Sequence, residues 1–132
     1  MPVIRRQTAE EQATWQTARP SWLKASAYGS FRLPKGTPTS IELHYHDADE
    51  IWFIGAGRAR IRSEGVEYDV RPGDLVCTGM GDEHQILEVY EELIGFFLEG
   101  ELEGLRRPGH LHRETDGVPV PRRRPATIEP GR

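Results

Sequence analysis

The stretch HYHDADEIWF, residues 44–53, places two histidines and three acids directly before an apolar run. In an extended strand, residues two apart share one face, so His44 and His46 point the same way, together with Glu42. Tyr45 points to the opposite face. Two imidazoles a few ångströms apart on one strand face suit a divalent cation, and this pattern predicts a metal site.

Glu50 follows these histidines after a short corner and can return a carboxylate to the same face. By the same parity, Trp52 and Ile54 form an apolar pocket wall beside the ion. His84 opens a later strand-like run after the turn GMGDE, where glycines allow a close backbone approach, so it is the candidate fourth ligand. Glu88 shares the face of His84 and is a candidate general acid or base, with Glu42 as the other.

Short strand-like runs separated by Gly, Pro and Asp fill residues 27–99, with no long helix among them. This texture is typical of an all-β sandwich or barrel. The expected strands are 27–33, 39–46, 49–56, 58–65, 66–71, 74–79, 84–90 and 92–99.

The barrel segment has an arm on either side. Residues 1–26 form an N-terminal arm, in which Thr8 and Glu11 resemble a capping box and predict a short helix over residues 9–17. Residues 100–132 are rich in Pro, Gly and Arg and are expected to be a disordered tail or an extended arm lying on the barrel.

Two spacings resemble the motifs of the cupin superfamily. His44-x-His46-x3-Glu50-x6-Gly57 is similar to the first motif, and Gly73-x5-Gly79-x-Gly81-x2-His84 is similar to most of the second. Three positions depart from the pattern and are not ligands in it: Pro38, Gly79 and Glu88 replace a glycine, a proline and an asparagine.

The resemblance implies a double-stranded β-helix (cupin or jelly-roll) barrel over residues 27–99, of the small single-domain kind. It also implies that one divalent transition metal, Fe, Mn, Ni, Co or Zn, is bound by four side chains: His44, His46, Glu50 and His84. One or two coordination positions would stay open for water or substrate.

Function is less constrained than fold, because this fold hosts many activities. We expect a metal-dependent cupin that acts on a small polar metabolite, as a dioxygenase or as an isomerase, epimerase or lyase. The alternative is a non-catalytic cupin that binds a sugar or another metabolite.

The net charge of -4 argues against nucleic acid as a partner, and no apolar run approaches the ~18 residues that span a bilayer. The N-terminus has no apolar signal-like core, so a cytoplasmic protein is expected, and cupin resemblance with long arms favours a homodimer. Four further residues are expected to have no role in the metal site. The corner acid Asp47 is expected to be solvated, Cys77 to be a small buried side chain, and His110 and His112 to be surface residues of the tail.

Overall fold

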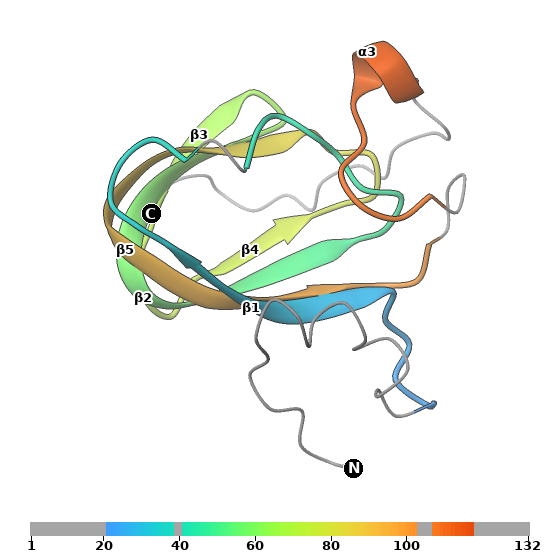
Figure 1. Ribbon diagram of the computed structural model, residues 1–132, viewed down its shortest axis with the longest axis horizontal. Helices are drawn as coiled ribbons and strands as arrows, with labels where there is room; N and C mark the ends of the chain where they lie inside the picture. The colour runs from blue at the N-terminus through green and yellow to red at the C-terminus, as the bar shows by residue number, and fades with distance from the viewer. Residues whose placement is uncertain (1–20, 39–40, 103–106, 118–132) are drawn as a thin grey trace.

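The computed structural model describes residues 21–38, 41–102 and 107–117, and its regular elements are almost all strands (Figure 1). The elements are β1 (Ala27–Leu33), β2 (Glu50–Ser63), β3 (Val66–Val70), β4 (Leu75–Thr78), β5 (His84–Glu99) and the one-turn helix α3 (Arg113–Asp116). The all-β expectation is confirmed. The helix expected over residues 9–17 lies outside the described ranges, and no helix within them is long and apolar enough to cross a membrane.

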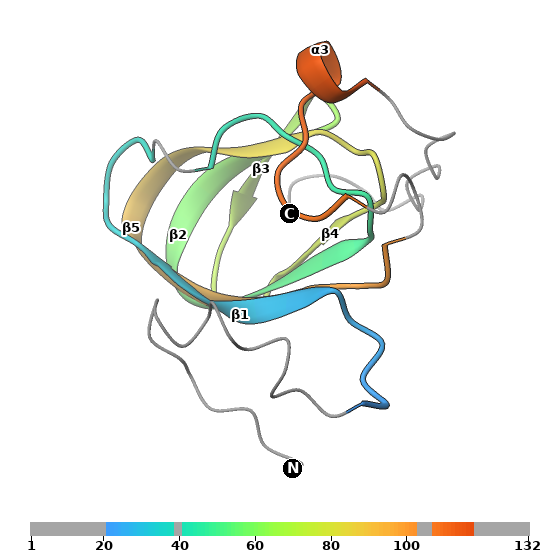
Figure 2. The same cartoon turned by 45° about the vertical axis from the view of Figure 1, so that its right-hand side comes forward.

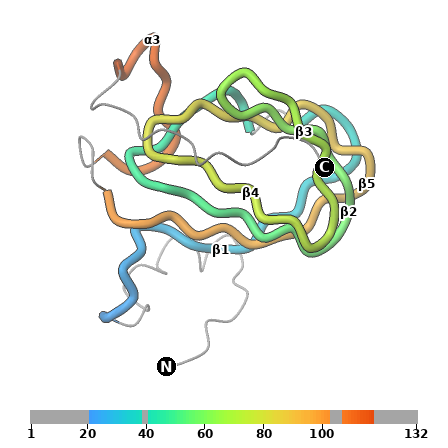
Figure 3. Tube along the Cα trace, turned by 180° about the vertical axis from the view of Figure 1, so that it is seen from behind, coloured from blue at the N-terminus to red at the C-terminus, as the bar shows by residue number. Residues whose placement is uncertain are grey.

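The antiparallel pair of β2 and β5 is the spine of the sheet. These strands have 14 and 16 residues, and they pair from Glu50↔Glu99 to Ser63↔His84. Strand β1 pairs with the other edge of β5, while β3 and β4 share the remaining edge of β2. The strands curve around a common interior (Figure 2), and β2 and β5 can be followed side by side round the bend in Figure 3.

The observed strands differ from the expected ones in two ways. Runs 49–56 and 58–65 join into β2, and runs 84–90 and 92–99 join into β5, because each pair continues through an irregularity rather than a turn. The strand expected over 39–46 is wrong for residues 41–46. That segment makes only isolated bridges, His44↔His84 and Tyr45↔Leu111, because it passes between two different neighbours at the barrel end.

Gly57 lies at the irregularity in β2 and changes which residues face the interior. Before it, Trp52 and Ile54 are buried, and after it, Ala59 and Ile61 are buried, so the inward parity switches from even to odd. The φ of Gly57 is 87°, and a Cβ at this position would lie 2.0 Å from the carbonyl oxygen of Glu92. A side chain is therefore excluded, and the bulge lets the long strand bend around the barrel.

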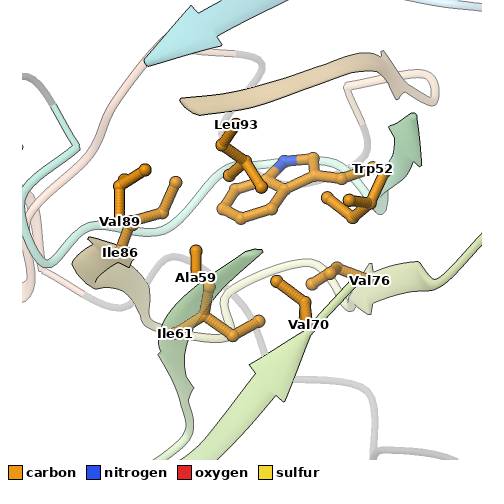
Figure 4. Close-up of a cluster of buried hydrophobic side chains, with 9 residues drawn as sticks. Trp52, Ala59, Ile61, Val70, Val76, Ile86, Val89 and Leu93 are labelled. Atoms are coloured by element: carbon orange, nitrogen blue, oxygen red, sulfur yellow. The ribbon is translucent and has the colours of Figure 1, made fainter. Parts of the chain in front are cut away.

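The interior is filled by apolar side chains from four of the strands, which converge in Figure 4. The fully buried members are Trp52, Ile54, Ala59, Ile61, Val70, Val76, Ile86, Val89 and Leu93. At ~25 cal/mol per Å² of apolar surface removed from water, this cluster is the main favourable contribution to folding. This apolar cluster occupies the middle of the barrel. A group of polar side chains lies at one end of it.

Cys77 lies on the outer face of the sheet, contrary to the sequence expectation. Cys77 is exposed rather than buried, because it pairs with Ile51 on the strand face opposite the buried Trp52 and Val76. Arg60 and Arg62 also face outward and form half-exposed ion pairs with Glu67.

We predict that Gly57→Ala lowers the free energy of unfolding by about 2–4 kcal/mol, because the new methyl group collides with backbone that cannot move aside. Chemical denaturation monitored by circular dichroism measures the loss. Gly73→Ala is the matched control, since Gly73 has φ 94° but open space around its Cβ position, and about 1 kcal/mol of strain is expected there. Equal losses in the two variants would contradict the proposed steric cause.

Candidate metal centre

Four ionisable side chains meet at one end of the barrel. His44 and His46 come from the segment before β2, Glu50 is the first residue of β2, and His84 is the first residue of β5. The backbones of His44 and His84 pair through two hydrogen bonds, of 3.1 and 2.8 Å. The two strand starts are therefore fixed against this segment before any side chain is considered.

The ligand atoms of His46, Glu50 and His84 all lie within 4.8 Å of one another inside the protein, and the ring of His44 lies beside them. Nε2 of His46 lies 3.4 Å from Oε2 of Glu50, and Nε2 of His84 lies 3.4 Å from Oε1 of the same carboxylate. The ring of His44 has its centroid 4.9 Å from that of His46 and 4.3 Å from that of His84. All four residues are at most 5% exposed. The sequence prediction thus named side chains that the structure brings together.

Each of the three histidines has its Nδ1 atom held by an oxygen outside this cluster. The acceptors are the carbonyl of Glu42 for His44 at 2.5 Å, that of Gly109 for His46 at 2.9 Å and that of Asp82 for His84 at 3.0 Å. With Nδ1–H donating outward, the lone pair of each Nε2 is left for the interior. Histidine ligands of metal ions are commonly oriented by such second hydrogen bonds.

The residues present fit a bound divalent metal. Nε2 of His84 is buried and has no hydrogen bond, which is costly unless a cation occupies the position it faces. Glu50 is oriented by the indole of Trp52, whose Nε1–H donates to Oε1 at 2.5 Å. A set of imidazoles with one carboxylate is a common donor set for Fe, Mn, Co, Ni or Zn.

The protonation states also favour a cation. Burial, together with the neighbouring ring of His84, lowers the pKa of His44 to about 3, so this imidazole is neutral at pH 7. Burial by itself would raise the pKa of Glu50, but the neighbouring imidazoles of His84 and His46 outweigh it and lower the pKa to about 2. Burial opposes protonation of His46 too, yet its hydrogen bond to Glu99 raises the pKa, so a metal ion would displace a proton there.

A pocket of about 350 Å³ opens beside the four residues. Trp52 lines it, as predicted. Ile54 lies in the apolar core, and Glu88 lies away from the pocket, where its Oε2 accepts a hydrogen bond from Thr37 at 3.2 Å. Glu42 is exposed beside the pocket, so its side chain does not share the interior with His44.

Residues 107–117, which we call the strap, cross the end of the barrel (Figure 2). Pro108, Gly109 and His110 of the strap line one side of the pocket. Leu111 is buried and its backbone pairs with that of Tyr45. The hydroxyl of Tyr45 donates to the carbonyl of Gly117. Arg113 binds Glu64 at 2.9 Å and Glu83 at 2.6 Å. The strap is therefore anchored to the barrel on both sides of Leu111.

His110, in the strap, is exposed, as expected of a surface residue, but it also contacts the candidate ligands. Its ring stacks on that of His44, with centroids 3.7 Å apart and planes inclined by 14°. One ring nitrogen of His110 lies within 4.8 Å of ligand atoms of both His44 and His46. The oxygen Oε1 of Glu42 lies 3.0 Å from Nδ1 of His110 and 3.0 Å from Nε2 of His112. The spacing of residues in the sequence could not predict the contact between His110 and Glu42, because these residues are 68 positions apart.

Two acids near the site also differ from what the sequence suggested. Asp47 is fully buried rather than solvated, and its Oδ2 accepts a hydrogen bond from the backbone N–H of Arg107 at 3.1 Å. Glu99 is buried opposite Glu50 in the register of β2 and β5, and its Oε1 lies 2.9 Å from Nδ1 of His46. Knowledge of the β2–β5 register would have revealed Glu99, whereas strand parity alone does not.

We predict that Arg113→Met loosens the strap, because its guanidinium joins the strap to Glu64, to Glu83 and to the carbonyl of Gly81. The expected cost in unfolding free energy is about 1–2 kcal/mol. Hydrogen exchange at the Leu111 amide should accelerate roughly tenfold.

Arg58→Met is the control for that change, since the Arg58–Glu91 pair is exposed and should contribute less than about 0.5 kcal/mol. If exchange at Leu111 is unchanged in Arg113→Met, the strap is held by other contacts.

Comparison with known proteins places residues 29–98 in the cupin domain family (Cupin_2). The uncharacterized protein y4oW of Sinorhizobium fredii is 41% identical over 119 residues, which cover 79% of this chain and 51% of that protein. This chain thus spans about half the length of the curated relative that it matches.

Several solved structures have a similar fold. The DMSP lyase DddQ of Ruegeria pomeroyi has a TM-score of 0.58 and 26% identity, covering 70% of this chain and 46% of that one. A predicted oxalate decarboxylase of Thermotoga maritima has a TM-score of 0.53 and 23% identity, covering 72% and 76% of the two chains. A double-stranded β-helix protein of Klebsiella pneumoniae has a TM-score of 0.56 and 17% identity, covering 71% and 90%.

Proposed function

Because this chain belongs to the cupin domain family, we propose that it is a metal-dependent enzyme that acts on a small molecule. The observation that carries the proposal is the buried cluster of three imidazoles and a carboxylate, in which Nδ1 of each histidine is held by a backbone carbonyl and Nε2 of His84 has no hydrogen-bond partner. One divalent transition metal would be held by His44, His46, Glu50 and His84.

The metal would supply Lewis-acid polarisation of a substrate oxygen or similar donor atom. Residues of the chain itself would orient the ligands and shape the pocket. Trp52 orients the carboxylate of Glu50, and Phe31 and Phe97 give the pocket apolar walls. His110 presents its ring at the pocket mouth as a hydrogen-bonding group, with Glu42 orienting it.

Among the reactions open to such a site, we favour a lyase over a dioxygenase, isomerase or epimerase. The support is the likeness to the DMSP lyase, at 26% identity and a TM-score of 0.58. Glu88 has no part in this proposal, since it lies with Thr37 away from the pocket.

The second candidate is a non-catalytic cupin that binds a metabolite. It is favoured by the pocket lining, in which every ionisable group is either in the ligand set or hydrogen-bonded to it or to Glu42. Turnover assays on the metal-loaded protein separate the two candidates. Product release from small hydroxy, keto and sulfonium compounds supports a lyase, oxygen consumption with ferrous iron supports a dioxygenase, and binding without either supports a binder.

We predict that the purified wild-type protein takes up a near-stoichiometric amount of a divalent transition metal, measured by plasma mass spectrometry after dialysis. His84→Ala and His46→Ala should each weaken metal binding at least about a hundredfold, because each removes a buried donor. His112→Ala is the matched control, since its ring contacts Glu42 rather than the cluster, and it should bind metal as the wild type does. A wild type that cannot be loaded would refute the proposal.

A further inference from the structure

The walls of the pocket are mostly apolar, although polar ligand atoms lie at its inner end. The apolar side chains that line it are Phe31, Leu33, Ile41, Trp52, Ile86 and Phe97. Phe31 and Trp52 meet edge to face, with centroids 6.1 Å apart. The space has a volume of about 350 Å³. A compact apolar group that binds there gains ~25 cal/mol of binding free energy for each Å² of apolar surface that it buries.

The charged groups of the same pocket are all acidic, histidines aside. Glu50 and Glu99 line it, both about 95% buried, and they face one another across the β2–β5 register. No lysine or arginine is among its described lining residues. Two arginines of the strap form ion pairs elsewhere, Arg107 with Asp116 and Arg113 with Glu83.

This distribution of charge disfavours anionic ligands. A bound divalent ion is already balanced by the two buried carboxylates, so nothing in the described walls compensates a further negative charge. Withdrawing an unpaired anion from water into a mostly apolar space is costly. The carboxylate of Glu99 would also repel that anion at short range in a medium of reduced dielectric constant.

We infer that the pocket selects an uncharged or cationic small molecule that has a metal-binding atom at one end and a compact apolar body, and that it rejects anions such as sugar phosphates. The inference rests on the proposed metal-dependent function. The sequence predicted a small polar metabolite, and this inference restricts that class of ligand. The mostly apolar walls offer few hydrogen-bond partners to a ligand with several hydroxyl groups.

The test uses three probes that share one metal-binding nitrogen and differ in distal charge: benzimidazole, benzimidazole with a ring carboxylate, and benzimidazole with a ring aminomethyl group. Each is titrated by calorimetry into the zinc-loaded full chain, and the indole N–H resonance of Trp52 reports whether binding occurs in the pocket. The carboxylate should bind at least roughly tenfold more weakly than the other two. The indole resonance of the exposed Trp22 should not move.

Glu99→Gln removes one of the two negative charges, so the ratio of carboxylate-probe affinity to benzimidazole affinity, both measured on this variant, should rise toward one. Glu91→Gln is the control on the same strand, because Glu91 is exposed on the outer face and pairs with Arg58. It should leave all three affinities unchanged. Thermal unfolding of both variants establishes that they are folded.

Carboxylate binding as tight as that of the neutral probe would overturn the inference, and so would zinc-loaded protein that binds none of the probes. Failure of zinc uptake would instead refute the proposed function. In that case the charged probes are compared on the metal-free chain, where the cationic one should bind more tightly; the reverse order would overturn the inference as well.

Discussion

Burial of three imidazoles and a carboxylate at one end of a small barrel is the constraint on which the rest of the structure depends. Such groups are tolerated away from water only when each polar atom has a partner. The outer nitrogens of His44 and His84 bond to carbonyls two residues earlier in their own segments, whereas that of His46 bonds to the carbonyl of Gly109 and requires the strap to reach the site. The bridge between His44 and His84 and the course of the strap both bring these segments together.

The apolar core and the polar end are linked by the shape of one strand. Trp52 belongs to both, since its ring packs in the core while its N–H holds Glu50. The bulge at Gly57 lets the same strand that begins with a ligand continue with Ala59 and Ile61 facing inward. Without that change of parity, Arg58 and Arg60 would share the inner face with Glu50 and Trp52, and the barrel could not close on an apolar interior.

Much of this arrangement is predictable from the sequence. The double-stranded β-helix fold expected from the motif spacing is confirmed, and the bounds of β1 agree with the expected strand 27–33. What strand parity misses is non-local. Glu99 depends on the register of β2 and β5, Asp47 on a backbone donor 60 residues away, and His110 on the path of the strap. Local patterns carry no information about such contacts.

The strap has a consequence for how relatives of this protein can diverge. Residues 29–98 match the family and contain all four candidate ligands, whereas His110 and the rest of the strap lie beyond that segment. The candidate metal ligands and the residues that shape the mouth of the pocket therefore lie in different parts of the chain. Substitutions, insertions or deletions after β5 can alter which molecules enter while the ion-binding residues stay the same, so identical ligands in two relatives do not imply a common substrate.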